Sequence, residues 1–222
     1  MPTPLDSLLT YFEPLSTLRR DFRGTATLHT PGSPLLGANA SYLPEGSSPD
    51  LFALLRVWHQ AHDSPPLVVS ASPLPGLPAV ESLRVGPYLS AYQPGMIVAE
   101  QVSRLHLDRF AAVLCESCGL PEWAAPLSRT LASSLEHALA ATLLLAYAGD
   151  QEIGALLLLG NAAHLWGTLD PAADAPLLNA AAALVDGDLW TSLPDTSPLS
   201  VSGGAEVHYS LLVGDGPDYT TA

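Results

Sequence analysis

The chain has 222 residues, of which 48% are hydrophobic and 14% are charged, a composition typical of a folded globular protein and not of a disordered one. Its 8 basic residues are all arginine and stand against 22 acidic residues, which gives a formal net charge of −14. Because nucleic acids and anionic membranes are bound by clustered cations, this balance argues against both as partners.

The first half of the chain carries mixed helix and strand signals. Leucine and phenylalanine alternate with polar residues near the start, which predicts a short helix that ends at Arg20. Residues 23–43 indicate two strands around a turn at Pro31-Gly32. The further elements predicted in this half are a helix with Ser48 as N-cap that starts at Pro49, a strand at 67–70, a short helix at 78–85 and a strand at 96–102.

The second half begins with two helices and continues with strands. A helix over 106–118 is stopped by Gly119, and a longer helix is predicted over 125–141. Residues 143–169 are predicted to form consecutive antiparallel strands, with a hairpin turn at Gly149-Asp150. The elements that follow are a helix over 171–185, which crosses over to a strand at 189–193, and a final strand at 206–213. Strands and helices mixed in this order predict an α/β or α+β protein built on a central mixed sheet.

No segment has the pattern of a membrane span or a secretory signal. The longest apolar stretch, residues 138–148, is too short to cross a bilayer. The first residues lack a cationic start before an apolar core. Two cysteines do not make a disulfide framework in a chain of this size. The expected location is therefore the cytoplasm, with no membrane partner.

The cations are confined to the first part of the chain. From Thr130 to Ala222 there is no Arg or Lys, whereas there are 11 acidic residues. Phosphate backbones are held by cations, so we expect no binding to DNA or RNA at moderate salt. A gel-shift assay checks this expectation, and sub-micromolar binding to either nucleic acid would show that the charge argument is wrong.

Two short motifs contain residue types that bind metals or carry redox chemistry. Cys115 and Cys118 form a C-x-x-C motif, but at a helix C-terminus, where the dipole does not lower a thiol pKa. The interpretation we favour is two half-buried thiols. His59 and His62 are three apart near a helix end and could share a metal. Favourable placement of histidine at a helix C-terminus is the preferred interpretation, so no metal site is assigned.

Histidine and tryptophan side chains also lie on predicted strands of the second half. His164 and His208 could each act as a general base, although a packed histidine is the more common case. Trp166 lies in a strand and Trp190 near the start of one, where large aromatic side chains usually fill a core.

The hairpin AYAGDQEIGALLLL, the strand AHLWGTL and the step from Asp170-Pro171 into a helix resemble the core of the GNAT acetyltransferase family. Residues 22–102 are similar to the first half of a GNAT subgroup, through FRGTATLHTPGSPLLGANASYL and GPYLSAYQPGMIVAE. The resemblance implies an acyl-CoA N-acyltransferase fold with two GNAT-like halves, residues 1–104 and 105–222.

In GNAT enzymes the strand before the proline splays from its neighbour, and its backbone hydrogen-bonds the acyl and pantetheine arm of the cofactor. The following helix N-terminus holds the pyrophosphate through an R-x-x-G-x-G/A loop. The resemblance therefore implies acetyl-CoA or another acyl-CoA as cofactor and an amine, on a small molecule or a protein, as acceptor. The cofactor-binding residues that it implies are Trp166, Gly167, Thr168, Leu169 and Asn179.

The phosphate loop departs from the family pattern. Asp174 stands where the family has arginine, and Leu177 and Asn179 stand where it has glycine and glycine or alanine. Pro176 also removes an N–H donor. We expect Asp174 to act as a built-in anion at the helix start. No catalytic residue is assigned, and the family's tyrosine acid has no counterpart in SPLSVSGGA. Two hypotheses follow: an acyltransferase, or an inactive module of the same fold that binds a protein or small molecule.

Overall fold

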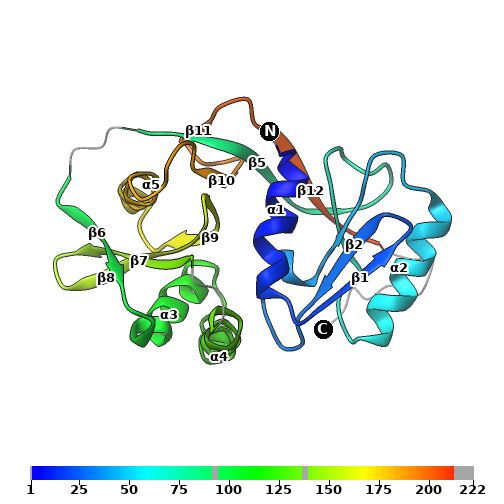
Figure 1. The fold of residues 1–222 in the computed structure, drawn as a ribbon, viewed down its shortest axis with the longest axis horizontal. Helices are drawn as coiled ribbons and strands as arrows, with labels where there is room; N and C mark the ends of the chain where they lie inside the picture. Colours follow the sequence, from blue (N-terminus) through cyan, green and yellow to red (C-terminus); the bar gives the residue numbers. More distant parts are fainter. Residues whose placement is uncertain (1, 92–94, 137–139, 213–222) are drawn as a thin grey trace.

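The computed structural model describes residues 2–91, 95–136 and 140–212. In this part of the chain, twelve strands form one mixed sheet in the order β1-β2-β3-β4-β12-β5-β10-β9-β8-β7-β6, and β11 pairs with β5 (Figure 1). The pairs β3–β4 and β9–β10 are parallel, and the other neighbours are antiparallel. The mixed α/β architecture predicted from the sequence is confirmed.

The strands are β1 (Leu18–Phe22), β2 (Thr25–His29), β3 (Ser41–Tyr42), β4 (Leu67–Ser70), β5 (Ala79–Leu89), β6 (Ile97–Val102), β7 (Ala141–Ala148), β8 (Gln151–Leu159), β9 (Ala162–Thr168), β10 (Trp190–Pro194), β11 (Ser200–Val201) and β12 (Ala205–Leu211). The α-helices are α1 (Pro4–Phe12), α2 (Pro49–Ala61), α3 (Leu107–Ser117), α4 (Ala124–Leu135) and α5 (Asp174–Ala182). Short 3-10 turns are η1 (Glu13–Leu15), η2 (Gly37–Asn39), η3 (Arg104–His106), η4 (Pro121–Trp123) and η5 (Pro171–Ala173).

The first helix is shorter than predicted. A capping box between Thr3 and Asp6 starts α1, and the helix ends at Phe12. Arg20 lies in β1, which forms a hairpin with β2. The turn of this hairpin has positive φ at Arg23 (52°) and Gly24 (88°). A run in which leucine alternates with polar residues fits a strand as well as a short helix, and pairing with β2 decides between them.

The predicted helix over 78–85 is wrong. Residues 79–85 belong to β5, which pairs with β12 on one side and with β10 on the other. Two neighbouring strands therefore override the local pattern. The predicted strands at 23–43 are β2 and β3, although the connection between them also contains η2. For the predicted helix over 125–141, α4 covers the first part, residues 137–139 lie outside the described part, and Ala141 belongs to β7.

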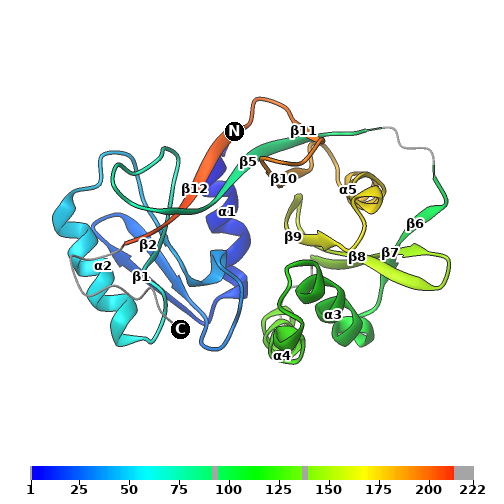
Figure 2. The same ribbon diagram turned by 180° about the vertical axis from the view of Figure 1, so that it is seen from behind.

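The second half follows its prediction. Strands β7, β8 and β9 are consecutive and antiparallel, and Gly149 takes positive φ (62°) in the hairpin turn. The chain then crosses over through α5 to β10, which runs parallel to β9. Helices α3 and α4 cover one face of these strands and α5 covers the other (Figures 1 and 2). The resulting layers fix the two sides from which β9 can be approached.

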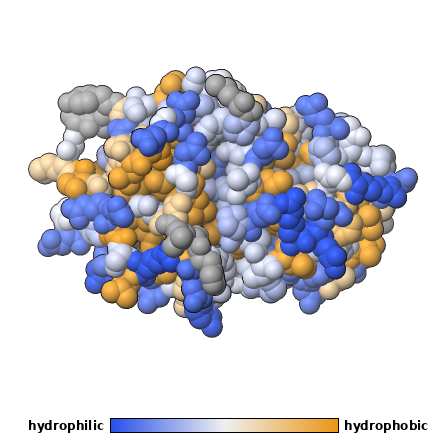
Figure 3. Space-filling model, in the orientation of Figure 1, coloured by the Kyte–Doolittle hydropathy of each residue, from blue (hydrophilic) through white to orange (hydrophobic). Residues whose placement is uncertain are grey.

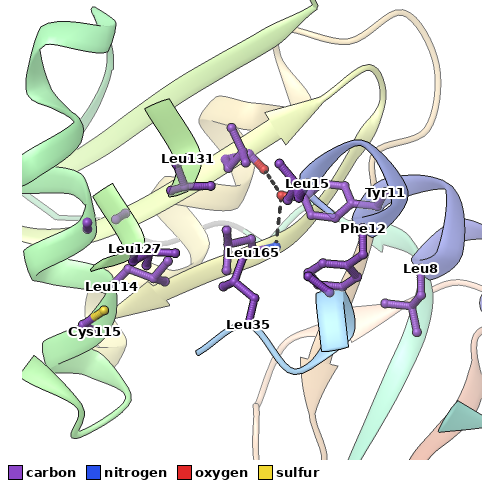
Figure 4. Packing of buried hydrophobic residues seen from close by; sticks show 14 of the residues in the cluster. Leu8, Tyr11, Phe12, Leu15, Leu35, Leu114, Cys115, Leu127, Leu131 and Leu165 are labelled. Carbon is purple, nitrogen blue, oxygen red and sulfur yellow. Dashed lines mark hydrogen bonds between the residues drawn. The ribbon is translucent and has the colours of Figure 1, made fainter. Parts of the chain in front are cut away.

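A large apolar core joins α1 to the helices of the second half. Phe110 of α3 is fully buried in it. Leu131 of α4 and Leu8 of α1 are also fully buried in it (Figure 4). Full burial of one such side chain stabilises a fold by about 1.5–3 kcal/mol. Helix α1 therefore buries one face against β9, whereas Asp6 and Thr10 on its other face are exposed.

Strands from the two predicted halves interleave. Strand β12 lies between β4 and β5, and β5 in turn pairs with β10. The division into halves at residue 104 stays a prediction. Among the described residues no helix is long and apolar enough to span a membrane.

Candidate functional site

The strands β9 and β10 diverge after two residue pairs. Ala162 pairs with Trp190 and Ala163 with Thr191, and no further pair joins the two strands in the described chain. We call the opening between residues 164–168 of β9 and residues 192–194 of β10 the splay. It is the place where the family resemblance puts the cofactor arm.

Strand β9 carries a bulge where the splay begins. Leu157 pairs with Leu165 and Leu159 with Ala162, so the single residue Leu158 of β8 faces two residues of β9. Such an extra residue interrupts the hydrogen-bond ladder and turns a side chain to a new direction. The two residues of β9 that face Leu158 are Ala163 and His164.

The hydroxyl of Tyr11 bridges the interrupted ladder. It donates to the carbonyl oxygen of Leu157 at 2.7 Å and accepts from the amide of Leu165 at 3.2 Å (Figure 4). Burial raises the pKa of Tyr11 well above its usual range, and the nearby amides of Leu165 and His164 oppose this only in part. The hydroxyl therefore stays protonated and serves as a structural link. Sequence reasoning missed it because its partners are 146 and 154 residues away.

His164 is buried beside Tyr11. Its Nε2 lies 2.9 Å from the hydroxyl oxygen of Ser7, and its ring meets the Tyr11 ring edge-on at 5.1 Å between centres. Its Nδ1 has no hydrogen-bond partner among the described residues. Burial lowers the pKa of His164 to about 3. A base with that pKa is weak at neutral pH, so the geometry does not favour His164 as a general base.

Trp166 spans the splay with its side chain. The indole Nε1 donates to the carbonyl oxygen of Ser192 on β10 at 3.0 Å. The ring also packs against the apolar cluster under α5. Where the two strands no longer bond to each other, the indole joins them instead.

Gly167 and Leu169 are tied to neighbouring elements. A Cβ on Gly167 would clash with the Ser117 hydroxyl at the end of α3, so the glycine allows a close approach of helix and strand. The amide of Leu169 donates to the carbonyl oxygen of Ile153 on β8 at 2.7 Å. Both observations describe packing, and a role of these residues in cofactor binding stays a prediction.

Two aspartates lie at the start of the segment that carries α5. Asp170 caps η5 by accepting from the amide of Ala172 at 2.9 Å. Asp174, the first residue of α5, accepts from the Thr168 hydroxyl at 2.5 Å. Burial raises the pKa of Asp174, the Thr168 bond lowers it, and Asp170 raises it. The side-chain bond of Asp174 thus goes to β9, and Asp170 provides the capping carboxylate.

The remaining positions of the phosphate loop face the interior. Leu177 is fully buried and lies against Gly154 of β8. The Asn179 amide accepts from the Tyr88 hydroxyl at 3.1 Å and donates to the Ala91 carbonyl oxygen at 2.8 Å. Residues 166–169 and the start of α5 therefore lie together, whereas Asn179 holds the end of β5.

An open groove of about 560 Å³ lies at the far end of β9, next to Leu169. Arg109 of α3 and Glu152 of β8 line it and form an ion pair, with Nη1 and Oε1 2.9 Å apart. The other residues that line the groove are Ala112, Val113, Glu116, Asp150 and Gln151. Its charge is negative on balance, which suits a cationic ligand.

The other candidates from the sequence lie away from the splay or are bonded elsewhere. Cys115 is buried and Cys118 exposed, both are free thiols, and burial raises the pKa of Cys115. The ring nitrogens of His59 lie 3.0 Å from the Ser41 hydroxyl and 2.9 Å from the Ser64 hydroxyl. Burial lowers the pKa of His59 to about 4, with smaller contributions from two neighbouring histidines.

His208 lies on β12 and bonds to the Ser82 hydroxyl at 2.9 Å. This bond joins two neighbouring strands, β5 and β12. The position of His208 therefore fits a packed histidine better than a general base.

Comparisons with known proteins identify the fold of this chain. No protein-family model and no curated protein sequence matches the chain. Among solved structures, a GCN5-related N-acetyltransferase from Kribbella flavida has a TM-score of 0.61 at 14% identity, covering 96% of this chain and 97% of its own. The chain has the GNAT fold.

Two further structures share this GNAT fold. A conserved protein of unknown function from Staphylococcus epidermidis has a TM-score of 0.60 at 12% identity, over 88% of this chain and 93% of its own. A protein described as a GNAT-family acetyltransferase, from Novosphingobium aromaticivorans, has a TM-score of 0.50 at 12% identity. The match covers 94% of this chain and 98% of that protein. The GNAT resemblance seen in the sequence is thereby confirmed at the level of the fold.

Proposed function

We propose that this chain is a GNAT-fold binding module whose acyl-CoA site is filled by its own side chains. The observation that carries the proposal is the hydrogen bond from the Trp166 indole to Ser192 across the splay. In GNAT enzymes that opening receives the pantetheine arm. Here the indole N–H supplies the bond to the β10 backbone that an amide of the arm could otherwise make. A ligand must displace both this bond and the ring before it can enter.

The phosphate end of the site supports the same proposal. Glycines in the family loop let backbone amides approach the pyrophosphate at the helix N-terminus. At the corresponding positions Leu177 is buried in the core and Asn179 is bonded to β5. Asp174 adds a carboxylate, and a carboxylate repels phosphate.

The surface beside α5 offers a place for a partner. Hydrophobic residues gather on the face of the molecule around α5 and the strands next to it (Figure 3). Leu184, which follows α5, is 50% exposed, and Val98 of the neighbouring edge strand β6 is 53% exposed. Exposed apolar surface of this kind is typical of interaction sites. We therefore favour a protein or an apolar small molecule, and not a nucleic acid, as the partner.

The second candidate function is acyl transfer from acyl-CoA to an amine. It is supported by the preserved splay and by the bulge in β9. The acidic groove at Leu169 would suit a cationic amine. Direct attack by a bound, deprotonated amine needs little beyond positioning, so the lack of an assigned base does not exclude it.

Calorimetric titration with acetyl-CoA and with pantetheine separates the two candidates. We expect acetyl-CoA to bind the unmodified protein no better than about millimolar and to leave the melting temperature unchanged. A ligand at about 100 times its Kd would otherwise add about 2.7 kcal/mol of stability. Micromolar binding of acetyl-CoA by the unmodified protein would instead support acyl transfer.

A Trp166→Ala variant tests the filled splay itself. Removal of the indole should let pantetheine bind more tightly than it binds the unmodified protein, because pantetheine carries no phosphate for Asp174 to repel. The matched control is Trp123→Ala. Trp123 lies in η4 and packs against the large apolar core that joins α1 to α3 and α4, so it does not cross the splay. Equal pantetheine affinity in all three proteins would show that Trp166 does not occupy the arm site.

A further inference from the structure

Strand β6 forms the outer edge of the sheet on the side of the second half (Figures 1 and 2). It pairs with β7 in one continuous register, from Ile97 with Ala148 to Val102 with Leu143. No strand of the described chain pairs with its other side. In an antiparallel strand every second residue turns its N–H and C=O away from the bonded neighbour. This edge therefore presents backbone donors and acceptors that another strand could take up.

The opposite edge of the sheet, β1, is protected by charge. Three of its five residues are charged, Arg19, Arg20 and Asp21. Arg19 also forms ion pairs with Glu13 at 2.6 Å and with Asp21 at 3.4 Å. Charged side chains on an edge strand oppose pairing with another chain. Strand β6 has one charged residue among its six, Glu100, and contains neither lysine nor proline. Of the two edges, β6 is the one open to a further strand.

The side chains of β6 divide between two faces. Ile97 and Ala99 pack under α5. Because side chains alternate along a strand, Val98 and Glu100 point away from α5, to the face on which α3 lies (Figure 1). Val98 is 53% exposed, and Glu100 is exposed as well. A strand added beside β6 would place its own side chains next to these two.

Carboxylates gather on the same face. Val98 pairs with Tyr147 of β7, and Tyr147 pairs with Glu152 of β8. Burial raises the pKa of Tyr147, and the Glu152 and Glu100 carboxylates raise it further, whereas Arg109 lowers it. The two carboxylates therefore lie on either side of one partly exposed tyrosine.

The acidic groove next to Leu169 continues this face inward. Glu152 and Arg109 line it, and so do Asp150 and Glu116. Together with Glu100 this makes four carboxylates beside one guanidinium. A negative surface of this kind attracts and orients a cationic partner.

We propose that the open edge of β6 binds an extended basic segment of a partner protein, which joins the sheet as a further strand and sets its cationic side chains against Glu100 and the groove. Backbone hydrogen bonds would hold such a segment, and its side chains would give specificity. This inference deepens the proposed binding function and rests on it, because it names the class of partner.

A second copy of the chain fits this edge less well. The protein has a net charge of −14, so two copies repel each other. Two-fold pairing of β6 with itself would also bring the Glu100 carboxylates of both copies close together, since Glu100 lies near the middle of the strand. A basic segment removes both costs.

Fluorescence anisotropy with a labelled peptide that alternates arginine and valine tests the proposal. We expect saturable binding at low salt that weakens as salt is added. A peptide that alternates arginine and proline has the same charge but cannot join a sheet edge, and it should bind at least about tenfold more weakly. Amide hydrogen exchange within residues 97–102 should slow when the first peptide binds. Equal affinity of the two peptides, or unchanged exchange in β6, would overturn the proposal.

Glu100→Arg tests the charge beside the edge. The substitution reverses an exposed charge, so the arginine–valine peptide should bind about tenfold more weakly at low salt. The matched control is Glu206→Arg, which makes the same change in net charge on β12, an inner strand, where Glu206 is 62% exposed. It should bind the peptide nearly as the unmodified protein does. If both variants lose the same affinity, the attraction is not local to β6 and the proposal is wrong.

Two further measurements separate this inference from the proposed function. If acetyl-CoA binds no better than about millimolar while the arginine–valine peptide shows no binding at about 1 mM, only the inference about β6 fails. Micromolar binding of acetyl-CoA would count against the proposed function itself. Sedimentation of the unmodified protein should show a monomer. A dimer that is lost in Glu100→Arg would assign the edge to a second copy and overturn the basic partner.

Discussion

Replacement of Leu177 by glycine is expected to destabilise the protein by about 3–6 kcal/mol. Leu177 is fully buried between α5 and β8, and the loss of a buried leucine side chain costs about 2–5 kcal/mol. Glycine inside a helix adds about 1 kcal/mol to this cost. Equilibrium unfolding in urea measures the effect.

Leu184→Gly is the matched control, because this leucine follows α5 and is 50% exposed. Its effect should be much smaller. Similar unfolding midpoints for the two variants would mean that Leu177 does not support the core.

If the large effect is found, restoring the family loop in full cannot serve as a clean test of coenzyme A binding. The variant with Arg at 174 and Gly at 177 and 179 should lose stability before any gain in affinity can be measured.

Tyr11→Phe is expected to cost about 2–4 kcal/mol, because it leaves two buried backbone groups without partners. These are the carbonyl of Leu157 and the amide of Leu165, which the hydroxyl now joins. Phenylalanine keeps the ring, so the apolar packing is preserved. Urea unfolding gives the free energy, and amide hydrogen exchange at Leu165 should become faster than in the unmodified protein.

Tyr147→Phe is the control for the loss of a hydroxyl. Tyr147 lies on β7 with its side chain partly exposed, and within the described residues its hydroxyl makes no hydrogen bond. The change should alter stability only slightly. If both variants unfold at the same urea concentration, the link across the bulge contributes nothing measurable.

The second half of the fold was predictable because its signals are local. A turn at Gly149 separates two runs of hydrophobic residues, and Pro171 marks the start of the crossover segment. The first half was harder. Arg20 and the residues of β5 carry patterns that fit helix and strand equally well, and only pairing with β2, β10 and β12 decides between them.

The candidate site was predictable only as a place along the chain. The sequence indicates that 163–169 form a strand before a helix; β9 covers this prediction as far as Thr168, and Leu169 lies in the bend that follows. The partners of its side chains could not be predicted, because they come from distant segments. Ser192 accepts from Trp166, and Tyr88 donates to Asn179 across 91 positions of the chain. Such contacts depend on the layers of the fold and not on local periodicity.

The position of β12 bears on how the chain folds during synthesis. Residues 205–211 are the last strand along the sequence, yet they lie between β4 and β5, which are made long before. Ribosomes add about 5–20 residues each second, so β4 and β5 wait several seconds or more with unpaired edges. Pairing over such separations also slows folding, since a long loop must close first. A cell that makes this protein must therefore keep those edges from aggregating until translation is almost finished.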